Sequence, residues 1–425
     1  MTAALYNIEL TRLKARYQSF IEQGLKLNMT RGKPCVEQLN LSNELLNNLS
    51  HKDVALTADC RNYSPPDLLT GLPQIKALFA SALGIHTNQI IVGGNSSLTL
   101  MYDTIIKAIV HKLPKQSNSW SEQGEIKFLC PIPGYDRHFA ICESFNIKMI
   151  NVPLTGDGPD MNQVEELVAN DSSIKGMWCV PKYSNPTGES YSNNTIERLA
   201  TMRTAASDFR IFWDNAYAVH HLNMHDQIEI LDILEECDKA GNPDRVFMFS
   251  STSKITYAGS GVAIIASNKG NYSWLIQHLK VQTIGYDKIN QLRHLKLLPN
   301  KKVFMQHMAK HATILKPKFD IVNKILNDEL GNDGRFAQWH NPKGGYFISF
   351  DSHPGLAKKI VKMAQDAGVK LTNAGATYPY GKDPSDCNIR IAPSLPTISE
   401  LKTATEVLSV VTRIATLEQM CNLQS

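Results

Sequence analysis

Short hydrophobic runs recur along the middle of the chain, and most are separated by segments long enough to form a helix. The runs are 3–6 residues long: Ile90–Val92, Lys127–Cys130, Met149–Leu154, Met177–Val180, Ile211–Trp213, Val246–Phe249 and Val262–Ala266. Short buried strands that alternate with helices are typical of α/β domains. The pattern therefore predicts an α/β fold with a mixed, mostly parallel sheet of about seven strands.

The two ends of the chain follow other patterns. Residues 4–25 carry apolar side chains at helical spacing, whereas the sequence from there to about residue 72 shows little periodicity. After residue 300, a helical stretch over 301–330 leads to an alternating strand at Gly344–Phe350. A second helix over 355–367 and a strand at Asn388–Ile391 follow, as expected of a smaller α+β domain.

These patterns divide the chain into three regions. We expect residues 1–50 to form an N-terminal helix and a segment that joins the small domain. Residues 51–300 would form the large domain, and residues 301–425 the C-terminal small domain.

Composition and charge exclude several classes of protein. The 425 residues are 43% hydrophobic and 20% charged, and 44 basic against 40 acidic residues give a net charge of only +4. Such a balance predicts no nucleic-acid partner. No apolar stretch approaches the ~18 residues of a membrane span, and the N-terminus lacks the pattern of a signal peptide. The eight cysteines are scattered without a CxxC pair, so we expect a cytoplasmic protein with reduced thiols.

Polar residues follow four of the hydrophobic runs directly. Ligands of open parallel sheets bind beyond the carboxyl ends of the strands, so these residues are candidates for a site. The four segments are Pro131–His138, Pro181–Gly188, Asp214–Tyr217 and Ser251–Lys254.

The last of these segments carries the most specific chemistry. Lys254 follows a buried run and the hydroxyl residues Ser251 and Ser253. A lysine at the end of a strand can form a covalent adduct with a carbonyl compound, and hydroxyls can donate hydrogen bonds to a phosphate. Pyridoxal 5'-phosphate (PLP) contains both groups.

Together the motifs resemble a known family. Asn185-Pro186-Thr187-Gly188, Asp214-x-x-Tyr217 and Ser251-x-x-Lys254 occur in the order and at the spacing of fold-type I PLP-dependent aminotransferases. The resemblance runs from about Thr30 to Pro396 and is greatest to a divergent bacterial (subgroup Ic-like) branch of the aspartate aminotransferases. It implies PLP as cofactor, bound by the large domain over residues 51–300, and an enzyme that is a PLP-dependent transaminase.

The resemblance also implies roles for the residues around the cofactor ring. Lys254 would hold PLP covalently and, once released, would move the proton between the substrate Cα and the cofactor. Asp214 would pair with the pyridine nitrogen and keep it protonated. Tyr217 and Asn185 would bind the 3'-oxygen. Tyr135 would stack on the ring.

Other residues match the family's phosphate and support positions. His138 would support Asp214. Asn95, Ser96 and Ser97 lie between a strand and a helix, where backbone N–H groups and hydroxyls suit a phosphate, and Ser251 would add another donor. Tyr63 resembles the residue that reaches the phosphate of the neighbouring subunit, which implies a homodimer with shared active sites.

Three residues, Arg390, Gly32 and Asn185, match the family's substrate positions. Arg390 matches the arginine that binds the substrate α-carboxylate, because a guanidinium can bind a carboxylate through two hydrogen bonds. Gly32 resembles the mobile glycine segment that closes over the substrate.

The sequence departs from the family at two positions. The arginine that usually binds the phosphate, about eight residues after the lysine, has no counterpart in Tyr257–Ala263. We expect a compensating cation, Lys288 in preference to Arg61, or else neutral donors alone. The arginine that usually binds the distal substrate carboxylate has no clear match either.

The leading interpretation is an aminotransferase that moves the amino group of L-aspartate to 2-oxoglutarate. Another PLP-dependent reaction, either transamination of a different amino acid or a lyase reaction, is the alternative. A PLP-sensing regulator would carry an N-terminal DNA-binding domain, for which the roughly thirty residues before Gly32 leave no room. His220, His221 and His225 lack further ligand residues, so no metal site is expected.

Overall fold

The computed structural model describes residues 3–57 and 68–424. A seven-stranded sheet forms the centre of the large domain, in the order β2-β8-β7-β6-β5-β3-β4. Every neighbouring pair is parallel except those that involve β8, which is antiparallel to both β2 and β7. The strands are β2 (Ile90–Val92), β3 (Lys127–Ile132), β4 (Lys148–Pro153), β5 (Ile174–Cys179), β6 (Arg210–Asp214), β7 (Val246–Ser251) and β8 (Ala263–Ala266). The predicted mixed, mostly parallel sheet of seven strands is confirmed.

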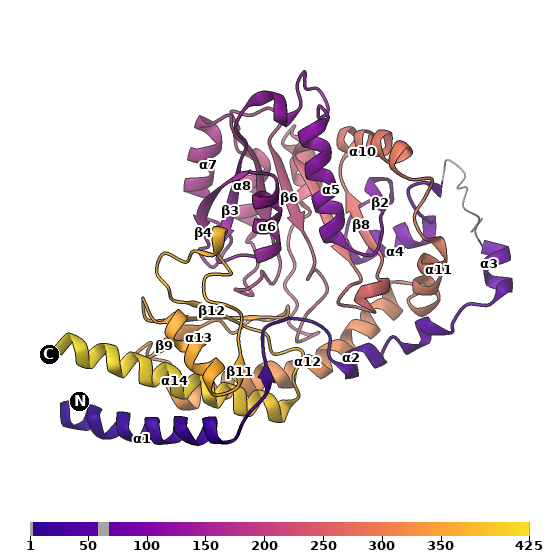
Figure 1. The fold of residues 1–425 in the computed structure, drawn as a ribbon. Coiled ribbons are helices and arrows are strands. Elements are labelled where there is room, and N and C mark those ends of the chain that lie inside the picture. Colours follow the sequence, from indigo (N-terminus) through magenta and orange to yellow (C-terminus); the bar gives the residue numbers. More distant parts are fainter. Residues whose placement is uncertain (1–2, 58–67, 425) are drawn as a thin grey trace.

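The central strands are buried on both faces, which explains their continuous apolar runs. In β6, Ile211 and Trp213 belong to one hydrophobic core and Phe212, which points to the opposite face, belongs to another. The first core is completed by α4 (Pro73–Leu83), α7 (Met161–Asn170), α8 (Asn193–Thr201) and α9 (Ile233–Lys239). The second is completed by α5 (Ser97–Val110), α6 (Asp136–Ser144) and α10 (Lys269–Gln282). Helices therefore cover both faces of the sheet (Figure 1).

The small domain joins the two ends of the chain around a third core. Its sheet has the order β12-β10-β9, all antiparallel, and a separate parallel pair joins β1 to β11. Helix α1 lies beside α14 at the lower edge of Figure 1. The elements are α1 (Ala3–Glu22), β1 (Leu27–Asn28), β9 (Ala337–Trp339), β10 (Ile348–Ser352), α13 (Ala357–Asp366), β11 (Val369–Lys370), β12 (Asn388–Ile391) and α14 (Ile398–Gln424).

The structure differs from the sequence-based expectation at Gly344–Phe350, where the strand begins only at Ile348. The reason is a close crossing between the domains. A Cβ on Gly344 would lie 2.4 Å from the Tyr183 ring, and Gly345 has a φ of +84°, which interrupts extended backbone. The low-periodicity region also contains two short helices, α2 (Val36–Asn40) and α3 (His51–Thr57).

The helix α12 (Lys301–Leu330) connects the two domains. Phe304 and Met308 in its first half belong to the large-domain core, and Leu315 and Phe319 belong to the small-domain core. The helix begins just after α11 (Lys288–Leu297), so the predicted boundary after residue 300 lies ahead of residues that still pack in the large-domain core. Among the described residues, no helix is long and apolar enough to span a bilayer.

Candidate active site

Two adjoining cavities lie beyond the carboxyl ends of β3, β5, β6 and β7. The inner one has a volume of about 170 Å³ and the outer one about 580 Å³. Both are lined by Tyr135, Asn185, Tyr217 and Lys254. Ser96, Ser97, Asp214, Ser251 and Ser253 line the inner cavity, and Gly32 and Arg390 line the outer one. The fold thus brings together residues predicted from segments that are far apart in sequence.

Lys254 lies three residues after the end of β7. Its amine is 5.0 Å from the centroid of the Tyr217 ring, and the Tyr346 hydroxyl donates to its backbone carbonyl at 3.1 Å. Burial lowers the pKa of Lys254, and the Asp214 carboxylate opposes this shift. A lowered pKa increases the fraction of neutral amine, which is the nucleophilic form.

Asp214 is the last residue of β6 and has only 4% exposure. Its Oδ2 lies 3.1 Å from Nε2 of His138, whose ring stacks on Trp178 at a centroid distance of 4.2 Å. Oδ1 of Asp214 is buried and has no hydrogen-bond partner among the described residues. A buried carboxylate oxygen without a partner requires a donor, and the inner cavity that Asp214 lines offers room for one. A protonated ring nitrogen fits this requirement.

The two tyrosines of the site are held in their phenol form. Burial raises the pKa of Tyr135 to about 12, with smaller contributions from the Asp214 and Asp136 carboxylates. Burial also raises the pKa of Tyr217 well above its ordinary value. Both hydroxyls therefore remain available as hydrogen-bond donors at neutral pH.

A group of hydroxyls lies at the N-terminus of α5. Ser96 is the N-cap residue of this helix, yet its side chain makes no capping hydrogen bond. Ser251 Oγ donates to Ser253 Oγ at 3.0 Å. The start of a 14-residue helix together with these serines suits an anion.

Other residues predicted to bind the phosphate lie elsewhere. Asn95 does not line the inner cavity, because its side chain donates to the Gly259 carbonyl at 3.2 Å. Lys288 begins α11, is buried, and lines neither cavity. Tyr63 and Arg61 lie outside the described residues. Among the residues described for the inner cavity, Lys254 is the only cationic side chain.

Arg390 reaches the outer cavity from β12 and has 7% exposure. Its Nη1 donates to Asp136 Oδ1 at 3.0 Å and to Asn185 Oδ1 at 3.3 Å. The guanidinium lies 4.8 Å from the centroid of the Phe347 ring. Gly32 approaches the same ring so closely that a Cβ there would lie 2.4 Å from Phe347 Cζ.

Several lining residues were not assigned a role from the sequence. Asp136 and Arg137 follow the predicted stacking residue Tyr135, and Arg31 and Lys33 flank Gly32. The only sequence signal for them is this adjacency. Phe347 offers none, because its contact with Arg390 joins β12 to the loop before β10.

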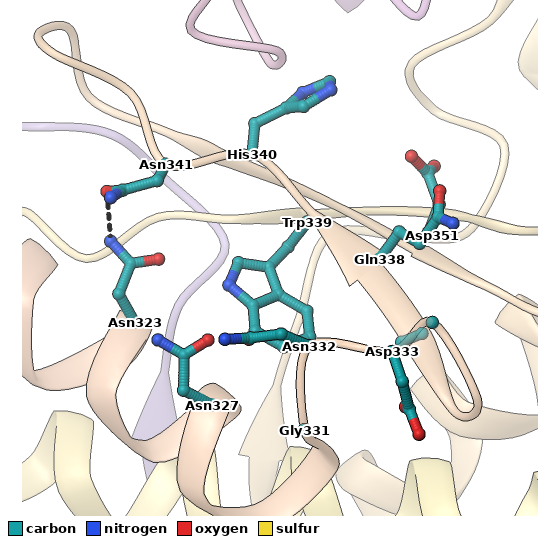
Figure 2. Close-up of a pocket in the computed structure, with 12 residues that line it drawn as sticks. Asn323, Asn327, Gly331, Asn332, Asp333, Gln338, Trp339, His340, Asn341 and Asp351 are labelled. Atoms are coloured by element: carbon teal, nitrogen blue, oxygen red, sulfur yellow. Dashed lines mark hydrogen bonds between the residues drawn. The ribbon is translucent and has the colours of Figure 1, made fainter.

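A separate cavity of about 590 Å³ lies in the small domain, between the end of α12 and β9 (Figure 2). Amide side chains gather around Trp339, and Asn323 donates to Asn341 Oδ1 at 2.7 Å. None of the predicted site residues lines it. His221 and His220 are likewise placed outside the two site cavities, and the Nδ1 atom of His221 lies 2.6 Å from the Tyr183 hydroxyl.

Known proteins are similar to this chain in sequence and in fold. The aspartate amino-transferase family model matches residues 2–424. An aspartate aminotransferase of Corynebacterium glutamicum is 42% identical over 413 residues, which cover 96% of this chain and 94% of that protein. A crystal structure of an aspartate transaminase from Corynebacterium glutamicum has a TM-score of 0.94 at 41% identity, and covers 99% of this chain and 98% of the other.

More distant structures share the fold. An α-aminoadipate aminotransferase of Thermus thermophilus superposes with a TM-score of 0.74 at 18% identity, over 97% of this chain and 98% of the other. The match of the family model over nearly the whole chain, and the 42% identity to an aminotransferase of which 94% is covered, show the family. This protein belongs to the aspartate amino-transferase family and is a PLP-dependent transaminase of fold type I.

Proposed function

We propose that the enzyme transfers the amino group of L-aspartate to 2-oxoglutarate, giving oxaloacetate and L-glutamate. The charge of the outer cavity supports this most directly. Apart from Lys254, its described lining includes four cationic side chains and a single carboxylate, that of Asp136. The four are Arg31, Lys33, Arg137 and Arg390. A cavity with this excess of positive charge favours substrates that carry two carboxylates.

The residues of the inner cavity fit PLP. When bound, this cofactor supplies an electron sink for the carbon that carries the amino group. Lys254 would attach it and would then take the proton from the substrate Cα and return it. Asp214 Oδ1 would accept a hydrogen bond from the ring nitrogen. Asn185 and Tyr217 would bind the 3'-oxygen, and Ser96, Ser97 and Ser251 the phosphate.

Arg390 would bind the α-carboxylate that all amino-acid substrates share. The side chain is buried, positively charged and held by an aromatic ring on one side. Lost charge-assisted hydrogen bonds to such a group cost roughly 1.5–3 kcal/mol each. Both half-reactions would depend on Arg390 to the same extent.

A substrate panel tests the proposal. Initial rates of the purified holoenzyme would be measured with aspartate, aromatic and branched-chain amino acids, each with 2-oxoglutarate as acceptor. We expect aspartate to give the highest kcat/KM among these donors. A preference for an apolar donor would instead support transamination of a different amino acid. Borohydride reduction followed by peptide mapping would check the cofactor separately, and a label on a lysine other than Lys254 would contradict its assignment.

A homodimer with shared sites belongs to the same proposal. Tyr102, Ile106 and Val110 are exposed apolar residues spaced four apart on α5, so they lie on one face of the helix. Val281, in the last turn of α10, and Ile284, two residues beyond the end of the helix, are also exposed. Lys107 of α5 donates to Gln282 at 2.8 Å, which places the two groups side by side. A second copy of the chain would cover this surface.

A further inference from the structure

The α-carboxylate site is not free to accept a substrate in this structure, because a carboxylate of the protein already binds it. Asp136 Oδ1 lies 3.0 Å from Arg390 Nη1, and both residues line the outer cavity. The side chain of Arg390 is 7% exposed and that of Asp136 is 37% exposed. Asp136 is therefore the more exposed member of the pair.

The hydrogen bonds of the guanidinium restrict where a second carboxylate can bind. Nε is buried without a partner, so the edge formed by Nε and Nη2 is closed to a ligand in this conformation. A ligand carboxylate can therefore bind only along the edge formed by Nη1 and Nη2. Nη1 carries two hydrogens, and the structure assigns one acceptor to each, Asp136 and Asn185. A bidentate substrate carboxylate on this edge needs one of these hydrogens.

Of the two acceptors, Asp136 is the one that can leave. Asn185 is 2% exposed and lies in the turn after β5, so moving its amide would leave a buried polar group without partners. Asp136 is the first residue of α6, where a carboxylate is stabilised by the helix dipole and by water. Its displacement from Arg390 therefore leaves the negative charge in a favourable position.

Building on the function proposed above, we propose that Asp136 is a positioning residue that exchanges with the substrate. In the substrate-free enzyme it holds the guanidinium of Arg390 towards the cavity. The α-carboxylate of the incoming substrate then takes its place on Nη1. The apparent affinity for every carboxylate substrate is therefore reduced by the free-energy cost of displacing Asp136 from Arg390.

The test measures binding of succinate, a dicarboxylate that cannot be transaminated, to the holoenzyme by calorimetry. Asp136→Asn keeps the shape and one acceptor but removes the charge. Its Kd for succinate should fall by about 5- to 30-fold, the ratio expected when a charge-assisted hydrogen bond becomes a neutral one. Glu37→Gln is the matched control, because it removes one negative charge from an exposed position of α2, near Lys33 in sequence. It should change the Kd less than about twofold, as expected for a screened surface charge.

Unchanged or weaker succinate binding by Asp136→Asn would overturn the exchange, as would equal tightening by both variants. A crystal structure of the succinate complex with Asp136 Oδ1 still bonded to Nη1 would do the same. Arg390→Ala separates this inference from the proposed function. If Arg390→Ala keeps normal succinate affinity, the substrate site itself is assigned wrongly. If it loses affinity while Asp136→Asn does not tighten, only the exchange is wrong.

Discussion

At the scale of single residues, the site depends on a polar atom that has no partner within the described chain. Oδ1 of Asp214, at the carboxyl end of β6, is buried and makes no hydrogen bond. An unpaired buried atom in a cavity wall is costly, and a ligand that donates to it removes this cost. Arg390, on β12 of the small domain, lines the adjoining outer cavity. A ligand that contacts both Asp214 and Arg390 would therefore bridge the two domains.

Asp214→Asn should separate catalysis from cofactor binding. The amide cannot hold the ring nitrogen protonated, and the lost charge-assisted bond is worth roughly 1.5–3 kcal/mol, so kcat should fall by about 10- to 150-fold. PLP should stay bound, as measured by the ratio of its absorbance to that of the protein, because the phosphate donors are unchanged.

The control is Asp226→Asn, the same chemical change at a surface residue that pairs with Lys343. It should leave kcat unaltered. Near-normal turnover of Asp214→Asn would refute the role assigned to this carboxylate.

At the scale of elements, the turn after β5 positions Asn185. Ser184 and Glu189 close this turn, since the Ser184 N–H donates to the Glu189 carbonyl at 2.8 Å. Burial raises the pKa of the Glu189 side chain to about 7, although backbone N–H groups at Gly156 and Gly158 favour its charged form. Its Oε1 is buried without a partner in the described structure.

The raised pKa of Glu189 gives stability a defined pH dependence. The folded protein holds this proton at pH values where the unfolded chain, with a pKa near 4.5, has lost it. Stability should therefore decrease as pH rises from about 4.5 to about 7. Glu189→Gln removes this contribution, and above pH 7 the variant should be more stable than the wild type by about 1–3 kcal/mol. Urea unfolding at pH 5 and pH 8 measures the difference, and an equal effect at both values would contradict it.

A single methyl group added at Gly32, in the segment between β1 and α2, should weaken substrate binding. Gly32→Ala would drive Phe347 away from its position beneath Arg390. Overpacking of this kind costs about 1–3 kcal/mol, so KM for both substrates should rise about 5- to 100-fold while PLP retention is unchanged.

Gly259→Ala is the control, because a Cβ there meets no atom within 4 Å. Steady-state kinetics of the two variants provide the comparison. A normal KM for Gly32→Ala would contradict the prediction, because it would mean that the segment accommodates the added methyl group without displacing Phe347.

Elements were more predictable than contacts between them. All seven hydrophobic runs of the large domain form strands, and the predicted helix over 301–330 coincides with α12. These elements were predictable because a buried strand or helix face requires apolar residues at continuous or periodic positions in the sequence. The Arg390–Asp136 pair joins residues 254 positions apart, and no local pattern encodes it. The prediction that β10 begins at Gly344 was wrong for the same reason: the backbone at Gly344 passes close to the ring of Tyr183, which belongs to the other domain.

At the scale of the whole molecule, the exposed face of α5 predicts assembly. Two chains of 47.4 kDa would give a dimer of about 95 kDa. Ile106→Glu should shift the protein towards the monomer in light scattering, because a charge cannot be buried unpaired in an apolar interface. Ile8→Glu is the control: Ile8 is the same residue type and is even more exposed than Ile106, but it lies on α1 at the far end of the molecule (Figure 1). A stable dimer of Ile106→Glu would place the interface elsewhere.

The helix α12 runs through both domains and links them mechanically. Pro317 lies near its middle, where it removes a backbone hydrogen bond and lowers the resistance to bending. Immediately beyond, Lys318 donates to the carbonyls of Ser394 and Pro396, so the second half of the helix moves with the small domain. At 1.5 Å per residue, a tilt of about 10° at Pro317 displaces Leu330 by roughly 3 Å. If the helix bends at this proline, Arg390 and the carboxylate that it binds would move towards or away from Lys254 together with the rest of the small domain.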